Sequence, residues 1–262
     1  MPGPSDPRQA PAEPGTPRHR VTASSLRNLR GWNAAVAISA AIVVFVVLIT
    51  GIGWLVSLNS HTTTYAVASL VSRVDVQLSS GQAVIVGSSS PGVQVRRTDR
   101  YSFGHPAHEK RWLDRGVLHI TSRCPEMVLG SCSASYELAV PEAVAVNVQT
   151  ATGDVRMTGF NGDAAVATRS GNVDVEAYCG FRLSARSDSG NLFVSTACAP
   201  QRLNLRTASG NAVALVPPGR YRIGATAGQG QQRVTGLVSD ASAPFTIDAH
   251  SASGSVNVEG GL

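Results

Sequence analysis

The apolar positions of this chain follow two patterns, and the first is a long apolar run over residues 33–58. No Lys, Arg, Asp or Glu occurs between Arg30 and Arg73. Because a helix rises about 1.5 Å per residue, a run of this length spans a hydrocarbon core of roughly 30 Å. A helix packed on a soluble core would be shorter and polar on one side. The run therefore predicts a transmembrane helix over residues 32–58.

The second pattern begins at Val74, where apolar and polar residues start to alternate. Val74, Val76 and Leu78 form the first apolar set, and similar short segments recur down to the C-terminus. Alternation with a period of two is typical of strands that bury one face. Aromatic residues are scarce at 5%, and the abundance of Gly, Val, Ser and Thr favours short strands and tight turns. We expect an all-β domain over residues 74–262, joined to the helix by a polar spacer over residues 59–73.

One motif recurs in the C-terminal half of this domain, beginning with Thr152-Gly153-Asp154-Val155. The glycines of the first four copies are 18, 19 and 20 residues apart, and the last follows after 44. That gap leaves room for one degenerate copy around residues 228–234. The repeated turn positions are Gly153, Asp154, Gly171, Asn172, Gly190, Asn191, Gly210, Asn211 and Gly254.

A single copy of this unit cannot bury its apolar face, so copies are expected to stack and share one core. Gly followed by Asn or Asp supplies the positive φ that a sharp turn needs. A period near 20 residues fits one coil of a β-solenoid, in which each coil lies about 4.8 Å above the last. An antiparallel meander is the alternative, but a fixed motif at a nearly fixed period favours the solenoid.

The repeated Ser/Thr-Gly-Asp/Asn-Val-x-Val turn follows a Tyr-x-Leu-x-Val-Pro strand, Tyr136 to Pro141. In these residues the chain resembles the bacterial putative-adhesin family of β-strand-repeat domains, which are similar to toast-rack-like domains on membrane anchors. The resemblance covers roughly Val74 to Val258, and residues 96–132 depart from the repeat. It implies a domain at the surface of the cell envelope, with no catalytic residues to carry over.

The N-terminal tail suggests how the chain is oriented. Residues 1–31 hold six of the fourteen prolines and no hydrophobic run, which predicts a disordered tail. The same residues hold five Arg against Asp6 and Glu13, so their net charge is +3 (5 − 2). The positive-inside rule then places the N-terminus in the cytoplasm and residues 59–262 outside a plasma membrane that the chain crosses once. The alternative is a cleaved signal peptide with its site at residues 66–68.

All four cysteines follow the apolar run, on the side where disulfides persist. Cys179 and Cys198 each lie eight residues after a repeat glycine, so stacked coils would place them one strand spacing apart. We therefore predict a Cys179–Cys198 disulfide, and a second disulfide, Cys124–Cys132, that closes a short loop. Four free thiols, or a metal site built from all four, are the alternatives; the chain has no Cys-x-x-Cys knuckle.

Residues 96–115 are unusually rich in basic and aromatic side chains and are predicted to form an irregular loop. Such side chains favour anionic or sugar-like ligands and protein partners, although the same loop could instead cap one end of the solenoid. His105, His108, Glu109 and His119 suggest a metal site, but a solvated polar stretch explains them as well. The candidate ligand residues are Arg96, Arg97, Arg100, Tyr101, Phe103, Arg111, Trp112 and Arg115.

No motif for an enzyme is present: the chain lacks a Gly-x-Ser-x-Gly elbow and a phosphate loop. We expect no cofactor, no metal and, because the sequence shows no basic face typical of nucleic-acid binding, no nucleic acid partner. The favoured function is a membrane-anchored binding, adhesin-like or scaffold module whose partner is a cell-wall polymer or another envelope protein. The alternatives are a regulator that senses envelope stress and signals through its helix or tail, and a polysaccharide-active enzyme with an acidic cluster on one solenoid face.

Overall fold

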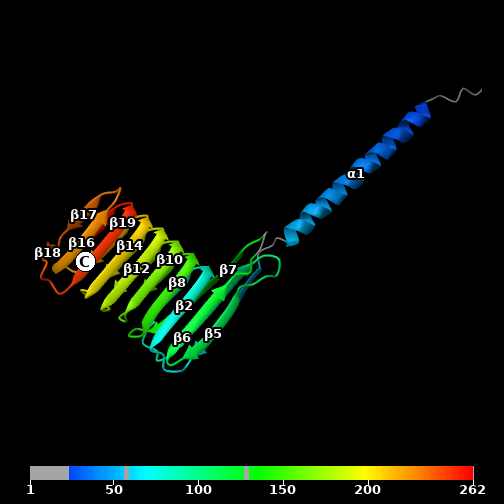
Figure 1. Ribbon diagram of the computed structural model, residues 1–262. Helices are drawn as coiled ribbons and strands as arrows, with labels where there is room; N and C mark the ends of the chain where they lie inside the picture. Colours follow the sequence, from blue (N-terminus) through cyan, green and yellow to red (C-terminus); the bar gives the residue numbers. More distant parts are fainter. Residues whose placement is uncertain (1–23, 56–58, 127–129, 262) are drawn as a thin grey trace, which may run out of the picture. The chain divides into compact units, whose positions relative to one another are not determined.

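The computed structural model describes residues 24–55, 59–126 and 130–261, and the chain divides into two units, Met1–Trp54 and Leu55–Leu262 (Figure 1). Helix α1 spans Ser24–Leu55, so it begins inside the tail that was expected to be disordered. The last proline of that tail is Pro17, and nothing after it prevents a helix. The rest of the tail lies outside the described residues. Within the described residues, no helix is long and apolar enough to qualify as a membrane span.

In the second unit, twenty strands form two ten-stranded sheets, which we name sheet A and sheet B. Sheet A contains, in spatial order, β1 (Asn59–Val67), β4 (Val93–Tyr101), β7 (Cys132–Pro141), β3 (Ala83–Ser88), β9 (Val155–Thr158), β11 (Val173–Tyr178), β13 (Leu192–Thr196), β15 (Ala212–Val216), β20 (Val256–Gly260) and β17 (Gln232–Thr235). Sheet B contains β18 (Val238–Ser239), β16 (Arg220–Ala227), β19 (Thr246–Ser253), β14 (Arg202–Ser209), β12 (Arg182–Ser189), β10 (Ala164–Ser170), β8 (Ala145–Thr152), β2 (Arg73–Ser80), β6 (Val117–Arg123) and β5 (His108–Asp114).

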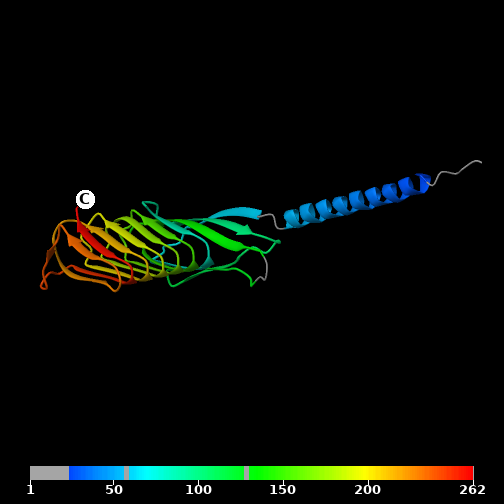
Figure 2. The same ribbon diagram turned by 90° about the horizontal axis from the view of Figure 1, so that it is seen from above.

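The strands wind as a two-sheet β-solenoid. From β8 to β15 each strand of sheet B is followed by a strand of sheet A, and neighbouring coils pair in parallel. The two sheets face each other as two layers (Figure 2). The apolar half of each alternating strand points between the layers, so equivalent residues such as Val148, Val166 and Leu205 are all buried. The predicted all-β repeat is therefore confirmed.

The repeat glycines form a column of turns along the solenoid. Gly153 and Gly210 have φ values of 136° and 141°, a conformation that residues with a Cβ rarely adopt. A Cβ at each of these glycines would collide with the backbone carbonyl of the glycine in the preceding coil. The column also includes Gly81, which the 153–258 repeat did not reveal because residues 83–144 interrupt the period.

The residue after each glycine ties one coil to the next. Asp154 Oδ1 accepts a hydrogen bond from the backbone N–H of Asn172 at 2.7 Å. Asn172 Oδ1 then accepts from the N–H of Asn191, and Asn191 Oδ1 from that of Asn211, each at 2.9 Å. This ladder stabilises backbone donors that a tight turn would otherwise leave without a partner.

The coils do not stack in sequence order. The degenerate copy predicted at residues 228–234 exists as β16 and β17, but it lies outside the last copy, β19 and β20. At the other end, β2 and β3 lie between the coil of β6 and β7 and that of β8 and β9. Motif spacing cannot reveal this order, because aliphatic rows in register pack equally well against several neighbours.

Antiparallel strands close the N-terminal end of the solenoid. Strand β1 pairs with β4, and β5 pairs with β6. Residues 59–67 are therefore not part of a spacer, which corrects the sequence prediction. This segment includes Thr62, Thr63 and Thr64, whose branched Cβ atoms favour extended backbone, and its Tyr65 packs on the core.

Both predicted disulfides are present. Cys179 and Cys198 link consecutive coils with their Cα atoms 4.7 Å apart, as the repeat register requires. Cys124 and Cys132, with Cα atoms 5.7 Å apart, join the end of β6 to the start of β7.

Removal of the inter-coil disulfide is expected to destabilise the domain. A closed loop of this length restricts the unfolded chain by about 3 kcal/mol in the chain-entropy model, so Cys179→Ala with Cys198→Ala should lower the free energy of unfolding by roughly that amount. Chemical denaturation of the non-reduced proteins measures the difference. An unchanged denaturation midpoint, with the wild-type disulfide verified by mass spectrometry, would contradict the prediction.

Candidate binding face on sheet B

The residues of the predicted ligand loop do not form a loop. Residues 96–101 belong to β4 in sheet A and residues 108–114 to β5 in sheet B, so only a short connection between them is irregular. On β4, Arg96 and Arg100 are exposed on the outer side, whereas the side chain of Arg97 points inward and is 13% exposed. Tyr101 ends the strand opposite Cys132.

The other members of the set are scattered as well. Arg111 lies over the ring of Tyr65, 4.1 Å from its centre, and Trp112 stacks on His119 at 4.8 Å. Phe103 and Arg115 occupy turns with φ values of 55° and 45°. The structure therefore distributes these side chains over both sheets and does not bring them together, because alternation along β4 and β5 sends neighbouring side chains to opposite faces.

Arg97 is the centre of a buried polar cluster that joins the two sheets. Its guanidinium group lies 2.8 Å from both Asp99 and Glu109. Tyr65 and Tyr136 donate their hydroxyl hydrogens to the carboxylate of Glu109 at 2.8 Å and 3.1 Å. Burial raises the pKa of both tyrosines, and for Tyr65 the hydrogen bond to Glu109 raises it further, so both stay protonated donors. The charged groups of this cluster pair with one another, which supports the interpretation that this segment caps one end of the solenoid.

The histidines are not arranged as a metal site. Glu109 points inward to Arg97, while His108 lies opposite Arg123 and is exposed on β5. His119 Nδ1 lies 3.5 Å from Asp75 on the neighbouring strand. No three His, Cys, Asp or Glu side chains among the described residues are grouped so that they could hold a metal ion.

The outer face of sheet B offers a different candidate, a trough that runs across its strands. Parallel strands in register place equivalent residues in rows, and Asn147, Ala165, Ser184 and Asn204 form one such row on β8, β10, β12 and β14. These four side chains are short and uncharged, so they form a low floor. The row continues to Asp75 at one end and to Asp248 at the other, so an acidic residue stands at each end of the floor.

Arginines stand on both sides of this floor. Arg182 pairs in register with Arg202 on one side, and Arg186 pairs with Arg206 on the other. All four side chains are exposed. Residues four apart along a strand are about 13 Å apart, so the two pairs flank the floor on β12 and β14 at roughly that separation. Beside the β8 and β10 part of the floor the lining is not basic, and it includes Asp163. We name Arg182, Arg186, Arg202 and Arg206 the arginine quartet.

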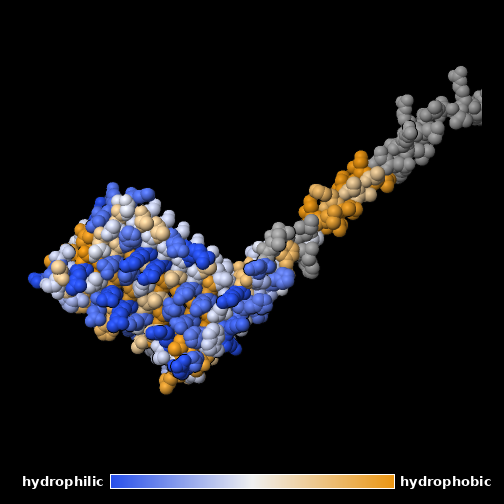
Figure 3. Space-filling view, in the orientation of Figure 1, coloured by the Kyte–Doolittle hydropathy of each residue, from blue (hydrophilic) through white to orange (hydrophobic). Residues whose placement is uncertain are grey.

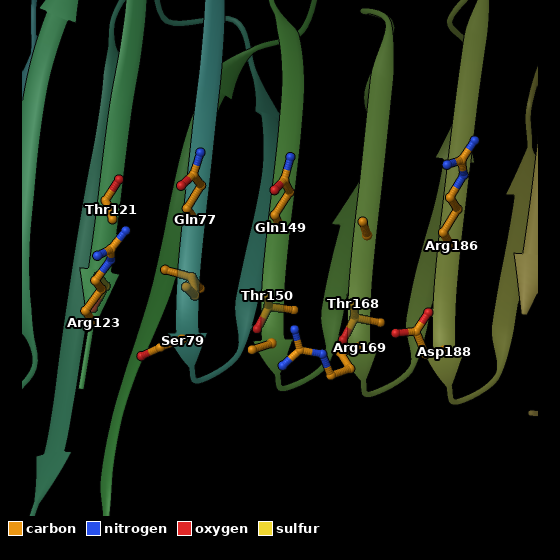
Figure 4. Close-up of a pocket in the computed structure, with 14 residues that line it drawn as sticks. Gln77, Ser79, Thr121, Arg123, Gln149, Thr150, Thr168, Arg169, Arg186 and Asp188 are labelled. Atoms are coloured by element: carbon orange, nitrogen blue, oxygen red, sulfur yellow. The ribbon is translucent and has the colours of Figure 1, made fainter. Parts of the chain in front are cut away.

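Three shallow depressions hollow this face. The depression at the strand ends has a volume of about 590 Å³, and Figure 4 shows Gln77, Gln149 and Arg186 along its strands, with Asp188 at the turn end. The second, of about 400 Å³, contains the floor residues Ala165, Ser184 and Asn204. The third, of about 440 Å³, lies around Arg206, Asp248 and His250. Figure 3 shows this face, which is mostly hydrophilic over the sheet B strands.

The outer face of sheet A differs in chemistry. Its equivalent row contains Arg156, Asp174, Phe193 and Val213, and Arg156 and Asp174 form an ion pair at 3.4 Å. Phe193 is 36% exposed, so this face is partly apolar and its charges are partly neutralised. The excess of basic side chains is therefore a property of sheet B, which corrects the expectation that the domain has no basic face.

Sequence reasoning did not find the quartet, although a signal was available. Arg182 and Arg186 are four residues apart, and Arg202 and Arg206 repeat this spacing 20 residues later. Twenty residues is the local repeat period, so the arginines had to align once the coils stacked. Basic residues are densest in 96–115, whereas the arginines of the quartet are marked only by their shared position in the repeat.

Comparisons with known proteins agree with the fold. No known family model and no curated protein sequence matches the chain. A putative cell adhesion protein from Clostridium sporogenes superimposes with a TM-score of 0.51 at 12% identity, over 78% of this chain and 100% of that one. A putative adhesin from Bacteroides fragilis reaches 0.41 at 11% identity, over 76% and 97%. A putative lipid binding protein from Parabacteroides distasonis reaches 0.30 at 9%, over 78% and 97%. The first of these shows that the β-fold of the domain is shared with an adhesin-type protein.

Proposed function

We propose that this protein is a non-catalytic binding module of the bacterial cell envelope, and that the outer face of sheet B is its binding surface. The observation that carries the proposal is the trough whose floor is a row of short uncharged side chains, flanked on β12 and β14 by the arginine quartet. A flat face built on paired strands, with coils tied by the turn ladder, is rigid before a ligand arrives. Rigidity of this kind reduces the entropy lost on binding.

Catalysis finds little support in this trough. Most glycoside hydrolases use two carboxyl groups that flank the scissile bond. In this trough Asp163 is the one acidic residue among those described that lines the depression at the floor, and Asp75 and Asp248 stand at opposite ends of the floor, several strands apart. The putative cell adhesion protein that shares the fold favours binding as well.

Attachment through α1 is part of the same proposal. The large apolar side chains of its described portion, from Val36 to Ile49, are 51–63% exposed. The run of uncharged sequence around them and the arginines before it favour a helix inserted in the plasma membrane, with the β-solenoid outside. The two disulfides also favour an oxidising compartment. The sensing role stays a prediction, since no contact among the described residues bears on it.

Blocking the floor tests the proposal. Ala165 is exposed on the outer face of sheet B, so Ala165→Trp adds bulk to the trough without entering the core. We expect it to reduce co-sedimentation of the full-length protein with isolated cell walls of the source bacterium by about 10-fold or more. Ala139→Trp adds the same side chain to the outer face of sheet A and should leave sedimentation unchanged. Equal sedimentation of both variants and the wild type would contradict sheet B as the binding surface.

A further inference from the structure

We propose that the trough on sheet B recognises a linear polyanion rich in hydroxyl groups, a glycan or polyol chain that carries repeated phosphate or carboxylate groups. In this binding mode the polymer runs along the solenoid axis, across the strands, with its hydroxyls on the floor and its anionic groups against the arginine quartet. The inference rests on the proposed function, because it assigns a ligand chemistry to the same face.

The first argument is the arrangement of like charges. Arg182 and Arg202 lie directly opposite each other on neighbouring strands, about 4.8 Å apart at the backbone, as do Arg186 and Arg206. Like charges in such positions destabilise a sheet. Among the ion pairs of the described residues, none involves a member of the quartet. Four guanidinium groups without an acidic partner are suited to bidentate recognition of phosphate or carboxylate groups from outside.

The second argument is the chemistry of the floor between the walls. Asn204 lines the depression of about 400 Å³, and its Oδ1 atom is buried without a hydrogen-bond partner among the described residues. Ser184 lies beside it on the neighbouring strand and offers a hydroxyl. An amide and a hydroxyl at the base of a trough can pair with polymer hydroxyls, which supply both a donor and an acceptor.

The third argument is the length of the site. Asn147, Ala165, Ser184 and Asn204 cover four coils, so the uncharged floor is about 14 Å long from first to last strand. Asp75 and Asp248 stand beyond it, and Asp163 lines its β10 part, so the carboxylates repel an anionic chain there and its anionic groups lie against the arginines on β12 and β14. The site is therefore long enough for two or three polymer units. A planar anionic membrane would contact the arginines but would leave the recessed floor empty, so the trough favours a polymer over a lipid surface.

The test compares two matched sets of four substitutions in the full-length protein. The first replaces the quartet (Arg182→Gln, Arg186→Gln, Arg202→Gln, Arg206→Gln). The second replaces four arginines on the outer face of sheet A (Arg96→Gln, Arg100→Gln, Arg156→Gln, Arg233→Gln), and it changes the net charge equally. Dissociation constants are measured for poly(glycerol phosphate), polygalacturonate and neutral dextran, and for vesicles containing phosphatidylglycerol.

We expect at least one polyanion to bind, and the quartet substitutions to weaken it by about 30-fold or more, with the sheet A set changing it less than about 3-fold. Tighter binding of poly(glycerol phosphate) would indicate a ligand with phosphate groups, and tighter binding of polygalacturonate a ligand with carboxylate groups. Asp248→Asn is an independent test, because a folding defect would not increase the affinity. It should tighten binding about 3-fold, because it removes a repelling charge at the end of the floor.

Several results would overturn the inference. One is an equal loss of polyanion affinity in both substitution sets, and another is an affinity for dextran equal to that for a polyanion. The others are tighter binding to vesicles than to either polyanion, and no binding to either polyanion. If neither polyanion binds while the wild type still sediments with cell walls and Ala165→Trp does not, the binding face stands and only this ligand class is wrong. If Ala165→Trp sediments like the wild type, the proposed function itself is wrong.

Discussion

Gly210→Ala is expected to destabilise the domain, with a loss of about 4 kcal/mol in the free energy of unfolding. Gly210 has a φ of 141°, which costs an alanine roughly 1–3 kcal/mol of backbone strain. A Cβ there would also collide with the carbonyl oxygen of Gly190 in the coil beneath. That oxygen cannot move away freely, since it accepts a hydrogen bond from Thr207 Oγ1 at 2.9 Å. The melting temperature should fall by roughly 8–16 °C.

Gly159→Ala is the matched control for this variant. Gly159 also has a positive φ, 63°, but a Cβ at this position would have no atom within 4 Å. Gly159→Ala should therefore lower the free energy of unfolding only by the backbone strain, about 1 kcal/mol. Differential scanning calorimetry of both variants separates strain from collision. Equal melting temperatures for the two would contradict the close stacking of the turn column.

Arg97→Met is expected to lower the free energy of unfolding by about 3–5 kcal/mol. The substitution leaves the carboxylates of Asp99 and Glu109, which are 8% and 10% exposed, without their cation. An unpaired buried charge is costly, whereas replacing a whole buried ion cluster by apolar residues is often neutral. A triple variant with Arg97→Met, Asp99→Leu and Glu109→Leu should therefore recover part of the loss, since the Tyr65 and Tyr136 hydroxyls lose their acceptor on Glu109.

Arg96→Met provides the control on the same strand. Arg96 is 61% exposed and its nearest carboxylate oxygen, on Glu137, lies 3.9 Å away, so its loss should cost less than about 0.5 kcal/mol. Urea denaturation of the three variants and the wild type gives the comparison. If Arg97→Met proved as stable as Arg96→Met, the polar cluster would not hold the cap to the solenoid.

The repeat made the solenoid and the Cys179–Cys198 disulfide predictable. Each turn needs a Gly at positive φ, followed by a side chain that forms a hydrogen bond to the next coil, so the motif recurs at the spacing of the coils. Asn172 and Asn191 are examples that can be recognised in the sequence. Cys179 and Cys198 share one position in consecutive copies, so their pairing followed from the spacing alone.

Other features were hidden because they depend on contacts between distant segments. Strand β1 is an edge strand whose partner, β4, lies in the segment that departs from the repeat, so its polar residues resembled a spacer. The stacking order at both ends could not be predicted, since rows of Val and Ala are interchangeable between coils. The face of each arginine became clear only with the register: Arg97 points inward to Glu109, while Arg186 and Arg206 align on the outside.

The central claim is that the outer face of sheet B, and not that of sheet A, holds the ligand. Footprinting of arginines with phenylglyoxal, read by mass spectrometry with and without isolated cell walls, tests it most directly. The account predicts that cell walls protect Arg182, Arg186, Arg202 and Arg206 while Arg96, Arg100 and Arg233 react as in the free protein. Equal protection on both faces, or protection on sheet A alone, would contradict it.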